Sequence, residues 1–92
     1  MIARILGDGQ YELDDGARSK FDKLDDALVQ HCEASDEDGF RQVLSEMIDL
    51  VRSEGTELPE GDLQASDAVV PSPTATLEEV QALLTEEGLL PD

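Results

Sequence analysis

The sequence predicts an α+β fold: a small single domain over residues 1–92, with an N-terminal β-hairpin packed on an αα-hairpin and a C-terminal helix. Three observations favour this fold. A glycine-rich turn joins two β-like segments, two amphipathic helical repeats follow, and a helix-capping motif opens the last segment. The expected divisions are a hairpin at 1–15, an αα-hairpin at 17–54, an ordered loop at 55–76, and a helix with its tail at 77–92.

The N-terminal residues have the pattern of a β-hairpin. The segment 2–6 is rich in aliphatic residues, and the turn Gly7-Asp8-Gly9 follows it. Glycine in such a turn tolerates the positive φ angle that a short hairpin loop requires. Polar and apolar residues alternate in the second strand, so Tyr11 and Leu13 share one face. Because a lone hairpin is unstable in water, this one must pack on the rest of the chain.

Two amphipathic helices are predicted over residues 18–33 and 37–53. Their apolar residues recur every three or four positions: Phe21, Leu24, Leu28 and Cys32 in the first, and Phe40, Val43, Leu44, Met47, Ile48 and Val51 in the second. Ser35 or Asp36 is expected to cap the second helix, and Gly55 to end it. The short link between the helices implies an antiparallel αα-hairpin.

The segment 55–76 holds three of the four prolines, which predicts a connection without a long helix or strand. It also contains apolar residues that need cover, namely Leu58, Leu63, Val69 and Val70. Residues 67–70 are therefore the candidate for a short third strand beside the hairpin, ended by Pro71.

A capping box predicts where the last helix begins. In Thr76-Leu77-Glu78-Glu79, the threonine hydroxyl would accept from the Glu79 N–H, and the Glu79 carboxylate would bond back to the Thr76 N–H. The apolar stripe of this helix comprises Leu77, Val80, Leu83 and Leu84, and Gly88 is its expected end.

The charge excludes several classes of function. There are 23 acidic residues against 6 basic ones, which gives a net charge of −17. Direct binding to DNA or RNA requires clustered Lys and Arg, and an anionic membrane surface would repel such a chain. Two explanations of the acidity stay open, a salt-rich cytoplasm and a basic protein partner. With no membrane-length apolar run and too short an N-terminal stretch for a signal peptide, we expect a cytoplasmic protein.

No catalytic, cofactor-binding or metal-binding residues are predicted, and no cofactor is expected. His31 and Cys32 are adjacent, so on a helix their side chains point about 100° apart and cannot form a nucleophile–base pair. The acidic run 36–39 fails as a calcium loop, since positions six and twelve of that loop would be Arg41 and Met47 rather than Gly and Glu. We therefore expect a protein that is not an enzyme.

What remains is an interaction module, whose candidate partner-binding residues are Tyr11, Val69, Val70, Leu89 and Leu90. In a chain this short, each of these apolar side chains can equally belong to the core. An acidic border around them would steer a basic partner and would change the association rate more than the affinity.

Several segments give the chain a family resemblance. They are Met1–Tyr11, Gly55–Pro59, Ser66–Pro71, Thr76–Val80 and Glu87–Pro91. In these segments the chain resembles the PspAA family, proteins associated with the phage-shock protein PspA, and its acidity resembles the haloarchaeal, halophilic members. The resemblance implies a non-enzymatic adaptor or regulator in the membrane stress response. Its partner would be a PspA-like coiled-coil protein that binds stressed membranes, and only this partner would recruit it to the inner face of the membrane.

A second class of function stays open beside the adaptor. An acidic inhibitor or antitoxin-like protein would occupy a basic site on its partner, and its binding would weaken steeply with salt. Such a mimic needs carboxylates aligned on one face at spacings similar to those of phosphates, whereas a surface adapted to salt would scatter them.

The charge also yields a prediction about stability. Raising sodium chloride from low to molar concentration should raise the melting temperature, because the Debye length falls from about 10 Å at 0.1 M to about 3 Å at 1 M and the acids repel one another less. Thermal denaturation followed by circular dichroism measures this. A melting temperature that ignores sodium chloride would show that self-repulsion does not limit the folded state.

Overall fold

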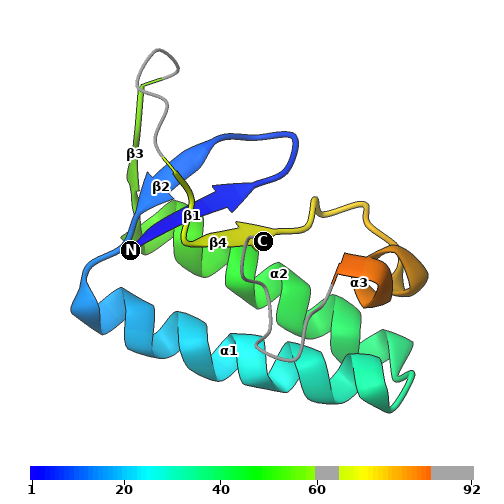
Figure 1. Cartoon of the computed structure of the whole chain (residues 1–92). Helices are drawn as coiled ribbons and strands as arrows, with labels where there is room; N and C mark the ends of the chain where they lie inside the picture. Colours follow the sequence, from blue (N-terminus) through cyan, green and yellow to red (C-terminus); the bar gives the residue numbers. More distant parts are fainter. Residues whose placement is uncertain (60–64, 84–92) are drawn as a thin grey trace.

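The computed structural model describes residues 1–59 and 65–83, in which a four-stranded sheet and three helices surround one apolar core (Figure 1). The elements are, in chain order, β1 (Ile2–Ile5), β2 (Gln10–Glu12), α1 (Asp15–Glu33), α2 (Glu37–Glu54), β3 (Thr56–Glu57), β4 (Ala68–Val70) and α3 (Leu77–Leu83). In Figure 1 the sheet lies over the C-terminal half of α2, and α3 lies over its N-terminal half. The α+β prediction is confirmed.

The sheet has the strand order β3-β2-β1-β4. β1 and β2 form the predicted antiparallel hairpin, in which Ala3 lies opposite Tyr11, and Gly7 takes a φ of 82° in the turn. β4 is the predicted third strand and pairs parallel with β1, with Arg4 opposite Val69. β3 was not predicted, because a two-residue strand carries no periodic pattern of its own. It pairs antiparallel with β2 directly after α2 ends.

Both long helices are capped by aspartates. α1 begins at Asp15, three residues earlier than expected, because the Asp14 carboxylate accepts from the Ala17 N–H at 2.8 Å. The prediction had placed Asp14 in the hairpin. Asp36, one of the two predicted caps, begins α2 by accepting from the Gly39 N–H at 3.1 Å. Ser35 instead occupies the turn between the helices with a φ of 54°.

Gly55 ends α2 as predicted, but the reason is close packing rather than a left-handed backbone. Its φ of −82° and ψ of 158° are extended angles that any residue adopts. A Cβ atom at this position would overlap the carbonyl oxygen of Val51 and lie 3.0 Å from side-chain atoms of Leu13 and Tyr11. Glycine therefore lets the hairpin approach the end of α2.

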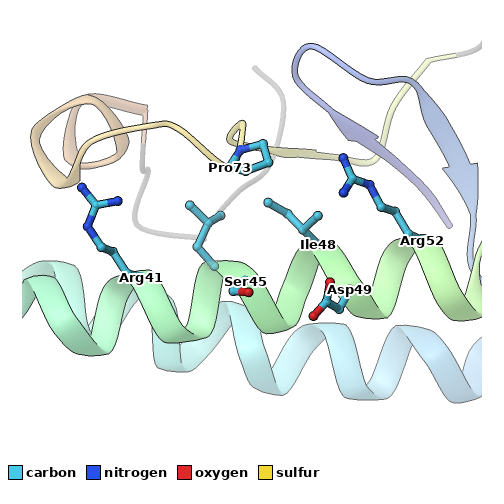
Figure 2. A pocket seen from close by; sticks show the side chains of 7 residues that line it. Arg41, Ser45, Ile48, Asp49, Arg52 and Pro73 are labelled. Carbon is cyan, nitrogen blue, oxygen red and sulfur yellow. The ribbon is translucent and has the colours of Figure 1, made fainter.

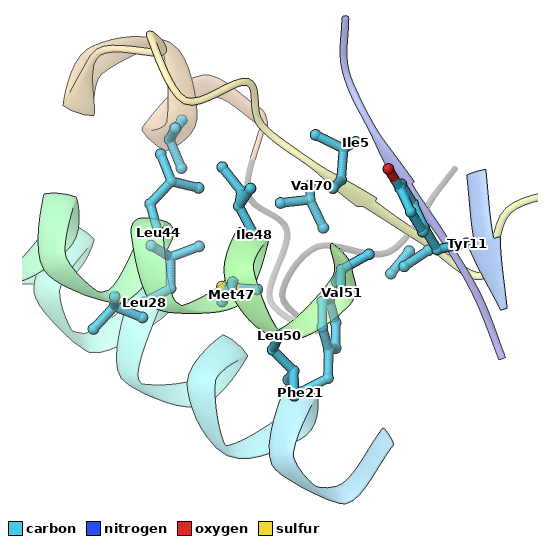
Figure 3. Close-up of a cluster of buried hydrophobic side chains, with 14 of the residues drawn as sticks. Ile5, Tyr11, Phe21, Leu28, Leu44, Met47, Ile48, Leu50, Val51 and Val70 are labelled. Atoms are coloured by element: carbon cyan, nitrogen blue, oxygen red, sulfur yellow. The ribbon is translucent and has the colours of Figure 1, made fainter. Parts of the chain in front are cut away.

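The core is built on the apolar stripe of α2 (Figure 3). All six predicted residues of that stripe are buried, and Leu50 joins them. From α1, three of the four predicted residues are buried and Leu24 is partly buried. α1 also buries Ala17, and the rest of the core comes from the sheet, α3 and the loops: Ala3, Ile5, Tyr11, Leu13, Ala68, Val70, Ala75 and Val80. β1 and β4 thus turn alternate residues toward the helices, whereas both residues of β3 are exposed.

α3 begins at Leu77, as the capping box predicts. The Glu79 N–H donates to the Thr76 hydroxyl at 3.2 Å, whereas within the described part of the chain the return bond from the Glu79 carboxylate is not formed. The Gln81 amide donates to the Cys32 carbonyl oxygen at 2.8 Å and so ties α3 to the end of α1. The predicted cover for Leu63 and the predicted helix end at Gly88 lie outside the described residues.

The central position of Met47 yields a test of this core. Met47 is fully buried between the elements, so Met47→Ala should lower the free energy of unfolding by about 2–5 kcal/mol. That is a large part of the roughly 5–15 kcal/mol typical of a whole domain. Urea denaturation measures the loss, with Gln42→Ala on the exposed side of α2 as the control. Equal midpoints for the two variants would contradict the assignment of the core face.

Candidate functional site

A shallow groove of about 170 Å³ lies between α2 and the segment that follows β4 (Figure 2). Its lining residues are Arg41, Leu44, Ser45, Ile48, Asp49, Arg52 and Pro73. Leu44 and Ile48, each 3% exposed, form an apolar floor, and Figure 2 shows the two arginines at opposite ends. This volume is below the roughly 300–1,000 Å³ of small-molecule sites. The groove therefore suits side chains of another macromolecule better than a metabolite.

Arg52 is held at one end of the groove by the hairpin turn. Its Nε–H donates to a carboxylate oxygen of Asp8 at 2.9 Å, and this bond raises the pKa of the Arg52 guanidinium. The Tyr11 hydroxyl lies 3.3 and 3.4 Å from the two oxygens of the same carboxylate and donates to it. Asp8 thus joins the turn, the second strand and the last turn of α2 in one polar cluster.

Arg41 is held less firmly at the other end. Its Nη2 lies 3.4 Å from a carboxylate oxygen of Glu37, one helical turn earlier. Both side chains are more than half exposed, at 51% and 62%, so the pair contributes little to stability. The Arg41 guanidinium can therefore exchange Glu37 for another carboxylate at small cost.

The predicted partner-binding residues that belong to the sheet lie on its two different faces. Tyr11 and Val70 belong to the inner face, where they are 8% and 0% exposed, so these two side chains take the core position that the sequence also allowed. Val69 points to the opposite face and is half-buried. Leu89 and Leu90 lie outside the described residues. The groove carries no local signal in the sequence, because Pro73 and α2 are far apart in the chain and meet only in the folded structure.

The reactive side chains of the helical hairpin have structural surroundings. Cys32 is buried, which raises the pKa of its thiol, and His31 Nδ1 lies 3.1 Å from an Asp36 carboxylate oxygen beside the cap of α2. Cys32 is buried in the core and His31 is only partly buried, so the two neighbours have different surroundings. In residues 1–59 and 65–83, no three His, Cys, Asp or Glu side chains come close enough to hold a metal ion. None of the helices described there is long and apolar enough to cross a bilayer.

The buried Tyr11 hydroxyl makes stability depend on pH. Burial, and secondarily the negative charge of Asp8, raises its pKa above the usual 10.0. The unfolded chain therefore loses this proton first, so the Tyr11 contribution is complete below about pH 10 and is lost as pH rises through the raised value. Urea denaturation at alkaline pH should show a shallower decline for Tyr11→Phe than for the natural chain. Since Tyr11 is the only tyrosine, tyrosinate absorbance also reports its pKa directly. A folded-state pKa at or below 10.0 would contradict this account.

Comparison with known proteins agrees with the family resemblance in the sequence. The chain matches the model of the family described as PspA-Associated protein, PspAA, over residues 1–92. No curated protein and no solved structure matches it significantly. The match includes the hairpin, both long helices and the segment that forms the groove wall. The chain therefore belongs to the PspAA family of PspA-Associated proteins.

Proposed function

We propose that this protein is a non-enzymatic adaptor or regulator that binds a PspA-like coiled-coil protein. The observation that carries this proposal is the family match over residues 1–92, because the family is described by its association with PspA. The role includes the membrane stress response, and the partner is the only element that would contact lipid. An unaided chain with a net charge of −17 would be repelled by the anionic inner face of a membrane.

The surface chemistry supports a binding role. Within residues 1–59 and 65–83, three of the six Lys and Arg side chains are seen paired with carboxylates, namely Lys20 with Glu54, Arg41 with Glu37 and Arg52 with Asp8. The acidic residues far outnumber all the cations, so the long-range field around the protein is strongly negative. Such a field would accelerate encounters with a cytoplasmic partner that carries a basic region near its binding surface.

The acidic face of α1 favours a second candidate function, the inhibitor that occupies a basic site. Asp15, Asp22, Asp26 and Glu33 are all exposed, and their spacings of seven, four and seven residues place them along one side of the helix. With a rise of 1.5 Å per residue, neighbouring members lie about 6 or 10 Å apart along the axis. This row of four carboxylates on one side of α1 supports the second candidate function.

A titration with the cognate PspA-like protein tests the adaptor proposal. We expect a dissociation constant of roughly micromolar or below at physiological salt, measured by isothermal calorimetry with both full chains. No detectable heat or complex at that concentration would refute the proposal.

A double variant, Asp22→Asn with Asp26→Asn, distinguishes the two candidate functions. An adaptor whose acids only steer encounters should lose association rate and keep most of its affinity. An inhibitor that inserts this face into a basic site should lose affinity, and its residual binding should depend less on salt. Asp38→Asn with Glu46→Asn on α2 makes the same charge change elsewhere and serves as the control.

A further inference from the structure

We propose that the groove on α2 is the docking site for one amphipathic helix of the partner, which inserts two apolar side chains and places a carboxylate at each of Arg41 and Arg52. This inference rests on the proposed function and names the surface and the chemistry through which it would operate. It is carried by the spacing of the lining residues, the apolar floor, and the charge at the two ends.

The lining residues have the spacing that receives a helix. In coiled coils, each inserted side chain enters a hole formed by four residues of the facing helix at i, i+3, i+4 and i+7. Two such sets follow one another in the groove, namely positions 41, 44, 45 and 48, and positions 45, 48, 49 and 52. The seam Arg41, Ser45, Ile48 and Arg52 therefore repeats at intervals of four, three and four residues, as in a heptad.

This seam is distinct from the part of α2 that packs on α1. Arg41, Ser45 and Arg52 are exposed, whereas Ile48 also belongs to the core. The small Ser45 side chain allows a facing helix to approach closely. Leu44 and Ile48, each 3% exposed, form the apolar floor, and Pro73 forms the opposite wall (Figure 2). An incoming aliphatic side chain would displace a few waters from this space, each of which occupies about 30 Å³ in the liquid.

The arginines determine the charge of the occupant. Among its lining residues the groove carries two cations and one anion, and each cation is already paired with one carboxylate, Arg41 with Glu37 and Arg52 with Asp8. In the described part of the chain, the Arg52 Nε–H donates to Asp8 and so holds the guanidinium group in place. The terminal nitrogens of this group can then donate to a second carboxylate. Among the residues that the structure describes, Arg41 has only its long contact with Glu37 to give up. At 0.15 M salt the Debye length is about 8 Å. The repulsion between an acidic partner and the distant carboxylates is therefore screened more strongly than the short contacts with the two arginines.

The spacing of the arginines specifies the partner sequence. Arg41 and Arg52 are eleven positions apart on α2, which is about 16 Å along the axis. A helix lying alongside α2 would match them with the seam Glu-x3-Leu-x2-Leu-x3-Glu, or with Asp in place of Glu. This pattern reads the same in both directions, so it fits a parallel or an antiparallel helix. Because the Asp49 side chain is negatively charged, it disfavours a further acidic residue near the middle of the partner helix's seam and favours Lys there.

Variants of the full chain test the groove against the cognate PspA-like protein by calorimetry. Ser45→Trp should fill both holes and weaken binding at least about tenfold, whereas Ser19→Trp, the same change on the exposed face of α1, should stay within about twofold. Arg41→Glu should weaken binding similarly, with Arg18→Glu as its matched control. Circular dichroism confirms that each variant is folded.

A probe that does not depend on the partner makes the two proposals separable. A stapled helical peptide with the Glu/Leu seam should shift the amide resonances of the groove residues of the ¹⁵N-labelled chain. A control peptide with Lys in place of both Glu residues should leave the groove resonances of the natural chain unshifted. This Lys peptide should bind the Arg41→Glu variant more tightly than the Glu peptide does.

Each outcome is informative. If the partner binds Ser45→Trp as tightly as the natural chain and the Glu peptide leaves the groove resonances unmoved, the groove proposal is overturned and the adaptor role stands. If the partner does not bind but the Glu peptide shifts those resonances, the docking site stands and the adaptor role fails. If neither ligand binds, both proposals fail. Binding of the Lys peptide in preference to the Glu peptide at the unmodified groove would overturn the assignment of an acidic partner helix.

Discussion

The apolar stripe of α2 is the surface on which the rest of the protein depends. α1 packs along one side of it, the sheet covers its C-terminal half, and α3 covers its N-terminal half (Figures 1 and 3). A sheet with strands of two to four residues and a helix as short as α3 would not be stable alone. Their burial on α2 also has to outweigh the mutual repulsion of 23 acidic residues in a chain of 92.

The same helix connects the core to the candidate site, because neighbouring stripes of α2 serve the two purposes. Met47 and Val51 face the core, while the flank that carries Ser45 and the two arginines faces the groove. The hairpin turn extends this connection through Asp8, which accepts from both Arg52 and Tyr11. One end of the groove is therefore built by the turn of the sheet, so a change that loosens the hairpin should also loosen the proposed docking site.

The charge of the protein has different effects at long and short range. At a distance the excess of carboxylates dominates, so the protein attracts basic regions and repels bare anionic membranes. Within the groove the two arginines, each paired with one carboxylate, are the groups that would meet acidic side chains of the proposed partner helix. A helical partner with a basic region near an acidic seam would satisfy both requirements. Its basic region would raise the association rate, and its acidic seam would orient the bound helix.

The sequence by itself determined the features that depend on neighbouring residues: the hairpin turn, both long helices with the cap at Asp36, the start of α3, and the α2 core stripe. Their signals are periodicity and side-chain bonds to the adjacent backbone, which act within a few residues. Only the tertiary structure decided that β3 pairs with β2, that Val70 is buried while Val69 faces the other way, and that Arg52 meets Asp8. These contacts join residues far apart in the chain, as the sequence separation of 44 for Asp8 and Arg52 illustrates. Such pairings depend on how the elements pack, and one strand or one arginine carries no local sign of its distant partner.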